Sequence, residues 1–279
     1  PLSSCNYGCT YCPFAKHTET STERQADSVA LTRFVNWIEN QSQIQFSLLF
    51  TPWGEALNRT RYQQALIKLT NLPNVKKAAI QTNLSCRLDW VEQCNKLSLA
   101  LWTTYHPTQV SRQRFIAKCH SLIKRGVRFS VGVVGLKEHL SEIKALRSEL
   151  PANIYLWGNA YKREPNYYTA DELQFITSLD PLFPINNQRH ASFGKSCRAG
   201  QAVISVDGTG TIHRCHFVPK PLGNIYDPSF SEILRERLCP NQTCDCHIGY
   251  VHLKELRLEE VFREGILERI PHSYANSLK

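Results

Sequence analysis

Three cysteines near the start of the chain have the type and spacing of ligands to an inorganic centre. Cys5, Cys9 and Cys12 follow the pattern C-x₃-C-x₂-C, and Tyr11 directly precedes the third cysteine. Iron–sulfur clusters are held by thiolates in short loops of this kind, whereas structural zinc sites more often close all four positions with two paired-cysteine segments. We therefore expect an iron–sulfur site, with a zinc loop as the alternative. A disulfide scaffold is excluded because nothing else in the chain is typical of a small secreted domain.

A second group of cysteines lies in the last third of the chain: Cys197, Cys215, Cys239, Cys244 and Cys246. Between the first two is the stretch Asp207-Gly208-Thr209-Gly210, flanked by runs of alternating hydrophobicity, which is a strong signal for a β-hairpin. Four thiolates suit either an iron–sulfur cluster or tetrahedral Zn²⁺, so both remain open for this second site. Cys86, Cys94 and Cys119 lie in or beside predicted helices and are expected to be buried core residues.

The elements that must position the first cysteines alternate between strand and helix with short connections. The hydrophobic pattern predicts strands at 45–50, 78–81, 97–102, 127–134 and 154–157, and helices at 27–40, 59–70, 88–95, 110–125 and 138–150. Such alternation predicts parallel βαβ units, whose active sites gather at the carboxyl ends of the strands. Beyond them we expect a helix at 171–179, strands at 202–206 and 211–215, a short helix at 229–237 and a helical tail at 252–270.

The cysteine pattern, with Tyr11 before its last member, resembles the signature of the radical S-adenosylmethionine (SAM) enzymes. The resemblance implies that Cys5, Cys9 and Cys12 bind a [4Fe–4S] cluster whose open iron takes SAM. It also implies a partial (β/α)₆ barrel of the α/β class. The chain contains no methionine, and we expect the barrel's first strand to precede Pro1.

Residues at the predicted strand ends match positions that contact SAM in this family. The resemblance implies this role for Tyr11, Gly54, Glu55, Asn83, Thr104, His106 and Val134. The match is imperfect, because Trp53 replaces the first glycine of a Gly-Gly-Glu motif and Leu84 replaces the glycine of a Thr-Asn-Gly motif. Glu55 could instead be a solvated residue in a turn, and His106 could cap a turn before Pro107. Asn159, which follows the last predicted strand of the barrel, is a further candidate for a contact with a ligand.

The C-terminal cysteines resemble the SPASM and twitch domains that hold auxiliary iron–sulfur clusters in this family. The resemblance depends on the spacing from Cys197 to Gly210 and Cys215, and on the run Leu222-Gly223-Asn224-Ile225. The implied ligands of one auxiliary cluster are Cys197, Cys215, Cys244 and Cys246, with Cys239 in reserve; His247 is expected only to follow the loop. The expected domains are a barrel at 1–160, a connector at 161–193, and an auxiliary-cluster domain at 194–279 ending in a helix.

Composition limits the function classes. The formal net charge of +9 permits an anionic partner, but the densest basic stretch, 118–128, fits a solvated helix face. No apolar run is long enough to span a bilayer, and many cysteines without a secretion signal favour a reducing cytoplasm. We expect an enzyme that cleaves SAM to a radical and modifies a peptide, with an electron donor such as flavodoxin or ferredoxin. The alternatives are a sugar, nucleoside or other small-molecule substrate, or a non-catalytic zinc protein that binds nucleic acid.

Overall fold

The structure is a computed structural model that describes residues 3–14 and 17–275 of the chain. The chain forms two compact units: unit 1 comprises Pro1–Pro184 and Glu264–Lys279, and unit 2 comprises Ile185–Arg263. These limits differ from the expected domain boundaries, because the helix at 170–179 and the end of the chain both belong to unit 1. Pro1 and Leu2, which open the cysteine stretch, lie outside the described residues.

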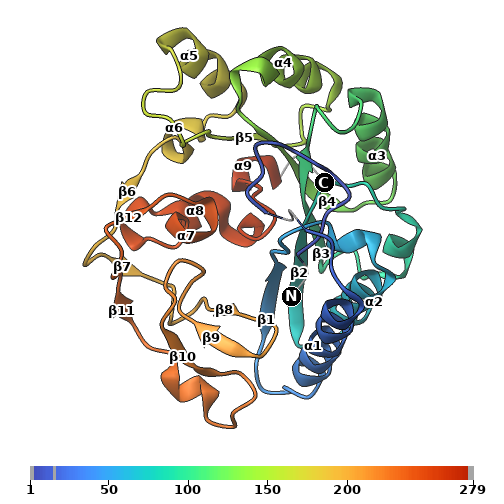
Figure 1. Cartoon of the computed structure of the whole chain (residues 1–279), viewed down its shortest axis with the longest axis vertical. Coiled ribbons are helices and arrows are strands. Elements are labelled where there is room, and N and C mark those ends of the chain that lie inside the picture. Colours follow the sequence, from blue (N-terminus) through green and yellow to red (C-terminus); the bar gives the residue numbers. More distant parts are fainter. Residues whose placement is uncertain (1–2, 15–16, 276–279) are drawn as a thin grey trace. The chain divides into compact units, whose positions relative to one another are not determined.

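Unit 1 is built on a five-stranded parallel sheet whose strands follow one another in sequence order (Figure 1). The strands are β1 (Phe46–Phe50), β2 (Val75–Thr82), β3 (Leu99–Tyr105), β4 (Arg128–Val134) and β5 (Leu156–Asn159). All four neighbouring pairs are parallel, as expected for strands joined by crossover connections. The predicted α/β class and its five strands are confirmed, with the architecture of a partial barrel.

Helices cover one face of this sheet. They are α1 (Ser21–Glu39), α2 (Thr60–Thr70), α3 (Arg112–Lys124), α4 (Leu140–Glu149) and α5 (Ala170–Leu179). Their apolar stripes, which include Ile38, Leu66 and Leu122, form one core with strand residues such as Ile80 and Leu101. Because side chains alternate along a strand, the residues between these face the opposite side of the sheet.

The opposite face is covered at its amino end by the C-terminal segment of the chain. Glu268 is fully buried and pairs with Lys77, whose Nζ lies 2.6 Å from Oε1, and with Arg128 at 3.0 Å. The guanidinium of Arg269 lies 4.2 Å from the ring centroid of Trp157 and 5.8 Å from that of Trp102. The segment ends in α9 (His272–Ala275).

Two predicted helices of unit 1 have different limits in the structure. Helix α1 begins at Ser21 because Thr20 and Glu23 form a reciprocal capping box that the sequence prediction overlooked. The helix expected at 88–95 is a short 3₁₀ helix, η2 (Asp89–Gln93). The remaining 3₁₀ helices of the unit are η1 (Ala56–Asn58), η3 (Lys137–His139) and, at its border with unit 2, η6 (Arg263–Gly265).

Unit 2 is a set of short strands and turns. Strands β8 (Ser205–Val206) and β9 (Thr211–His213) form the predicted hairpin, and β10 (Pro221–Asn224) extends it to three strands. Strand β7 (Ser196–Cys197) pairs with β11 (Arg237–Leu238), and β6 (His190–Ala191) pairs with β12 (Thr243–Cys244). Helix α6 (Phe183–Asn186) spans the sequence limit between the two units, and unit 2 also contains α7 (His247–Tyr250), α8 (Leu258–Phe262), η4 (Phe230–Ile233) and η5 (Lys254–Leu256).

The continuous C-terminal helix expected over 252–270 is not formed. The backbone enters the left-handed region at Arg257, Arg263 and Arg269, with φ of 49°, 45° and 55°. Each such residue interrupts the right-handed helical path, so the segment becomes short helical turns. The helix expected at 229–237 is likewise reduced to η4, and β11 follows it.

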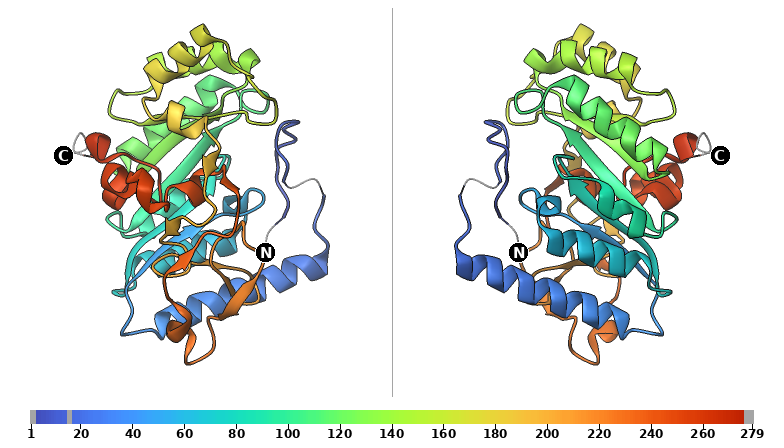
Figure 2. Two further views of the ribbon diagram at one scale, coloured as in Figure 1. Left: turned by 90° about the vertical axis from the view of Figure 1, so that its left-hand side faces the viewer. Right: turned by 90° about the vertical axis from the view of Figure 1, so that its right-hand side faces the viewer.

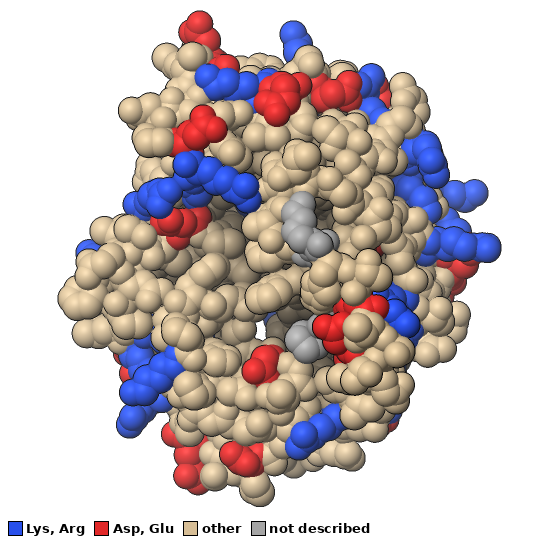
Figure 3. Space-filling model, viewed as in Figure 1, with Lys and Arg blue, Asp and Glu red and all other residues tan. Residues whose placement is uncertain are grey.

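Basic side chains gather over α3, on the right of the space-filling view (Figure 3). Acidic partners compensate part of this charge: Arg112 lies 2.7 Å from both Glu142 and Glu149, and Arg125 lies 3.0 Å from Glu92. This pattern fits the solvated helix face expected from the sequence. None of the helices within the described residues combines the length and the apolar character needed to cross a membrane.

Candidate functional site

The cysteine loop lies at the carboxyl ends of the first three strands of unit 1. Asn83, which follows β2, donates from Nδ2 to Asn6 Oδ1 at 3.1 Å. His106, which follows β3, places Nδ1 3.4 Å from Cys9 Sγ. In Figure 2 the described part of the loop, in dark blue, rises from the level of the start of α1. The chain thus brings Cys5, Cys9 and Cys12 to the sheet edge where the sequence predicted the active site.

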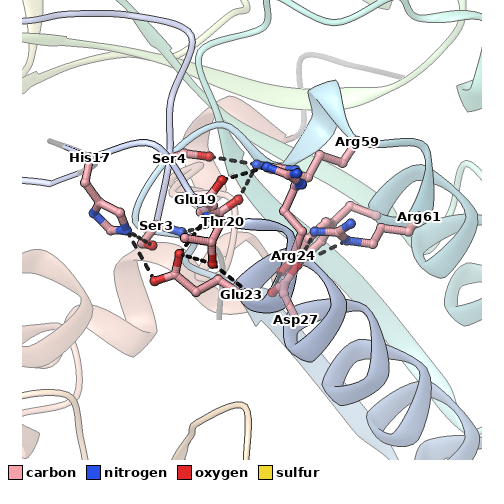
Figure 4. Close-up of polar contacts among 11 residues, drawn as sticks. Ser3, Ser4, His17, Glu19, Thr20, Glu23, Arg24, Asp27, Arg59 and Arg61 are labelled. Atoms are coloured by element: carbon pink, nitrogen blue, oxygen red, sulfur yellow. Dashed lines mark hydrogen bonds and ion pairs between the residues drawn. The ribbon is translucent and has the colours of Figure 1, made fainter.

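A buried carboxylate anchors the start of this loop (Figure 4). Glu19 is 3% exposed and accepts the backbone N–H of Ser3 at 2.7 Å. Arg59 forms an ion pair with Glu19 and donates to Ser4 Oγ at 2.7 Å. The residues just before Cys5 are therefore tied both to the segment before α1 and to the start of α2.

Gly54 allows the chain after β1 to approach the loop very closely. A Cβ at this position would lie 1.9 Å from the carbonyl oxygen of Ser4. The next residue, Glu55, donates its backbone N–H to the same oxygen at 3.2 Å. The glycine predicted to contact SAM is thus required in the structure for the close approach of two backbone segments.

We predict that Gly54→Ala destabilises unit 1 by about 1–3 kcal/mol, because the added methyl group must push Ser4 away and break its hydrogen bond. The variant should also retain less iron after anaerobic reconstitution. Urea unfolding followed by tryptophan fluorescence tests the first expectation, since all five tryptophans lie in unit 1. Gly8→Ala is the matched control within the loop, because a Cβ there meets nothing within 4 Å. Equal effects of both substitutions would contradict the prediction.

The carboxylate of Glu55 joins the ends of β1 and β2. It is 4% exposed and accepts hydrogen bonds from Leu57 N at 3.0 Å, Thr82 Oγ1 at 2.9 Å and Asn83 N at 2.5 Å. Burial raises its pKa to about 7, although all three donors act in the opposite direction. The solvated alternative is therefore wrong for Glu55.

This raised pKa predicts a pH-dependent stability. The folded chain holds a proton on Glu55 that the unfolded chain releases near its ordinary pKa of 4.5. The resulting stabilisation is complete below about pH 4.5 and is lost as the pH rises through about 7, a change on the order of 3 kcal/mol. Glu55→Gln removes the titration, so the difference in unfolding free energy between the two proteins should shift by this amount between pH 4.5 and 8. A constant difference across that range would show that Glu55 is not titrating there.

The three loop thiols lie close enough to influence one another. Burial is the largest effect on Cys5 and Cys9 and raises the pKa of both, and the neighbouring cysteines raise them further. Backbone N–H groups point at two of the three sulfurs, from Tyr7 to Cys5 and from Phe14 to Cys12, each at 3.4 Å. These features fit ligands whose negative charge must be compensated by a bound cationic centre.

Within 3–14 and 17–275, no set of three or more His, Cys, Asp or Glu residues is arranged to hold one metal ion. The fit of the loop to a cluster therefore depends on its donor set, three thiols with N–H groups directed at their sulfurs.

His106 and Tyr11 form an aromatic pair beside Cys9. Their rings stack with centroids 5.9 Å apart, and the Tyr11 hydroxyl lies 2.9 Å from His106 Nδ1. Burial, and secondarily His139, lowers the pKa of His106 to about 4. The imidazole is therefore neutral at physiological pH.

The other predicted SAM contacts lie farther along the same edge. Thr104 is opposite Gly132 in the β3–β4 ladder, and Val134 is opposite Asn159 in the β4–β5 ladder. Both are half-buried, whereas Thr103 is fully buried and donates to the Ser130 carbonyl at 2.6 Å, which is a sheet contact. The contacts described above connect Asn83 and His106 to the cysteine loop, and His106 reaches both Cys9 and Tyr11.

Several residues at the site were not predicted from the sequence. Gln109 accepts the backbone N–H of Gly8 at 2.9 Å, and Arg163 donates to the Tyr11 carbonyl at 3.0 Å. The ring of Tyr7 packs edge-on against His106, and that of His139 edge-on against Tyr11. Gln109 and Arg163 have no distinguishing local pattern, but Tyr7 and His139 carried a signal in their aromatic type and their position at the loop or a strand end.

The five cysteines of unit 2 form a second group of thiols. Burial, followed by Cys215, Cys239, Cys197 and Cys246, raises the pKa of Cys244 to about 12. Burial also raises the pKa of Cys215, with Cys197 and Cys239 as its cysteine neighbours. Cys246 is the exposed member of the group. The hairpin and the β7–β11 pair thus bring together residues up to 49 positions apart in sequence.

Known proteins of the same fold are found among solved structures. Neither the protein-family models nor the curated protein sequences include a match to the chain. A structure of anSMEcpe, an anaerobic sulfatase-maturating enzyme, with bound AdoMet and the Kp18Cys peptide, aligns with a TM-score of 0.54 and 15% identity. The alignment covers 83% of this chain and 77% of that one. A histidine-tagged form with bound AdoMet aligns over 99% and 96%, with a TM-score of 0.55 and 14% identity. The chain therefore has the fold of radical SAM enzymes with a SPASM domain.

Proposed function

We propose that this protein is a radical SAM enzyme that binds a [4Fe–4S] cluster through Cys5, Cys9 and Cys12 and modifies a peptide substrate. One observation carries the proposal: the C-x₃-C-x₂-C loop is fixed at the carboxyl ends of parallel strands by contacts from Asn83 and His106. Catalytic residues of parallel α/β barrels lie at this edge. The shared fold with AdoMet-bound anSMEcpe supports the same proposal.

The bound cluster would supply one electron to SAM, giving methionine and a 5′-deoxyadenosyl radical that takes a hydrogen atom from the substrate. The protein's own part is to bind, orient and shield the reactants. Thr104 and Val134, at the ends of β3 and β4, and Asn83 and Tyr11, beside the cysteines, are proposed to contact SAM. For Gly54 and Glu55 we propose an indirect role, because they fix the loop and the end of β2.

A peptide substrate is proposed because an anSMEcpe neighbour has been solved with a peptide bound. The sheet face that the helices leave uncovered carries Trp102, Thr104 and Gly132 along two adjacent strands. Trp102 is 5% exposed and the Trp157 side chain fills the space beside Gly132, so the half-buried Thr104 is the accessible one of these three residues. An external one-electron donor of the flavodoxin or ferredoxin class is also required.

For unit 2 we propose an auxiliary cluster held by Cys197, Cys215, Cys244 and Cys239. Arg237 is opposite Cys197 in the β7–β11 ladder, so Cys239, two residues on, is a diagonal neighbour of Cys197 on the same face. Cys239 also influences both Cys215 and Cys244, whereas Cys246 is exposed. These observations favour Cys239 as the fourth ligand. The sequence resemblance had instead implied Cys246, with Cys239 in reserve.

Iron, sulfide and zinc analysis of anaerobically reconstituted protein tests the proposal. Two [4Fe–4S] clusters give about eight irons and eight sulfides per chain. About four irons with one zinc would retain the enzyme but make the second site structural. Zinc without iron, and no 5′-deoxyadenosine from SAM with dithionite, would overturn the proposed function. Synthetic peptides as substrates, followed by mass spectrometry, then test the substrate class.

A further inference from the structure

Each sulfur of the cysteine loop has an N–H donor or imidazole nitrogen near it, but the sources differ. Cys5 and Cys12 accept from backbone N–H groups two residues farther along the loop, both at 3.4 Å. The nitrogen near Cys9 is Nδ1 of His106, also at 3.4 Å, and it comes from the end of β3, 97 residues away in sequence. Asn83, from the end of β2, also directs its Nδ2 at Cys5 Sγ at 3.7 Å, so Cys9 is distinguished by having an imidazole nitrogen beside it at the shorter distance.

Two aromatic rings contact the imidazole of His106. Tyr11 stacks on the His106 ring with an interplanar angle of 12°, and Tyr7 contacts it edge-on at 76° with centroids 5.8 Å apart. Both tyrosines belong to the cysteine loop. Their packing fixes the ring plane, and with it the direction of Nδ1 toward Cys9.

We propose that His106 donates its Nδ1–H to the Cys9 thiolate of the bound cluster and thereby raises the reduction potential of that cluster. A coordinated thiolate accepts hydrogen bonds and cannot donate one, so the imidazole must carry its proton on Nδ1. An N–H···S bond stabilises the more negative, reduced cluster, and such bonds are among the protein's means of setting cluster potentials. His106 is thus a positioning residue that acts on the cluster through Cys9.

The Tyr11 hydroxyl takes part in the same arrangement. It lies 2.9 Å from Nδ1 and also interacts with Cys9. With the imidazole proton on Nδ1, the hydroxyl accepts a share of that N–H and can donate its own proton to the sulfur. Tyr11→Phe should therefore lower the potential by less than removal of the imidazole does.

The inference rests on the proposed cluster at Cys5, Cys9 and Cys12, and its test is the midpoint potential of the reconstituted holoenzyme without SAM, measured by EPR-monitored titration. The signal of this cluster is identified as the one that changes when SAM is added. In His106→Ala we expect the ratio of reduced to oxidised cluster at a fixed potential to fall about tenfold, which for a one-electron couple is about 59 mV. ENDOR should show the loss of an exchangeable proton coupled to the cluster.

Two further variants separate the hydrogen bond from a general effect of substitution. His106→Asn places an amide N–H near the position of Nδ1 and should restore the potential. His120→Ala, at an exposed histidine of α3, should leave it unchanged. A wild-type potential in His106→Ala, or an equal shift in His106→Asn, would overturn the inference although the cluster is present. A wild-type protein without a SAM-responsive signal would instead overturn the cluster assignment, and this inference with it.

Discussion

Replacing Cys9 with alanine should abolish the cleavage of SAM and reduce the iron content by about half, from about eight to about four atoms per chain. Cys9 is 4% exposed, and it is the loop sulfur within reach of both His106 and Tyr11. Its loss removes one of three ligands and leaves two thiols that cannot hold the cluster. The cysteines of unit 2 belong to a separate compact unit and should keep their iron. Release of 5′-deoxyadenosine in the presence of dithionite measures the first effect, and iron and sulfide analysis measures the second.

Cys119→Ala is the control for this variant. Cys119 is fully buried in α3, where burial raises its pKa to about 12, so it is a core residue. Its substitution should cost about 1 kcal/mol of stability and leave both SAM cleavage and iron content unchanged. If the Cys9→Ala protein still produced 5′-deoxyadenosine, the reactive cluster would have to lie elsewhere in the chain.

The sequence was most informative where local pattern and chemistry coincide. The spacing of Cys5, Cys9 and Cys12 predicted a cluster-binding loop, and residues after β2 and β3 were predicted to contact SAM at the same sheet edge. Asn83 and His106 lie there, because the carboxyl ends of parallel strands share one sheet edge. Their detailed contacts could not be predicted, since a strand-end position does not fix which loop atom a side chain reaches. The contacts with SAM that were assigned to Asn83 and His106 remain predictions.

The sequence was least informative where distant segments meet. The apolar spacing at 252–270 suggested one helix, but a helical period does not reveal left-handed residues such as Arg257 and Arg263. The contact between Lys77 and Glu268 joins residues 191 positions apart, and neither residue belongs to a recognisable motif. Charged residues such as Lys77 and Glu268 are ordinarily assigned to the surface, so their burial became evident only from the structure.

The buried contact between Lys77 and Glu268 shows that the two ends of the sheet in unit 1 have different roles. Lys77 lies near the start of β2 and Arg128 at the start of β4, so Glu268 binds at the amino end of the sheet. The cysteine loop lies at the carboxyl end. In parallel α/β barrels the amino end generally serves stability and the carboxyl end serves chemistry. The C-terminal segment is therefore expected to support the barrel without taking part in the reaction.

Glu268→Ala should accordingly destabilise unit 1 by about 3–5 kcal/mol, because it leaves the buried ammonium of Lys77 and the guanidinium of Arg128 without their shared carboxylate. Burial already lowers the pKa of Lys77, and loss of Glu268 removes an effect that opposes this. Urea unfolding monitored by tryptophan fluorescence measures the change. Glu264→Ala is the control in the same segment: its side chain is 74% exposed and pairs with Lys76 at 3.4 Å, so no more than about 0.5 kcal/mol should be lost. The folded fraction of Glu268→Ala should retain the EPR signal of the barrel cluster. Loss of that signal at full stability would instead place the C-terminal segment in the catalytic machinery.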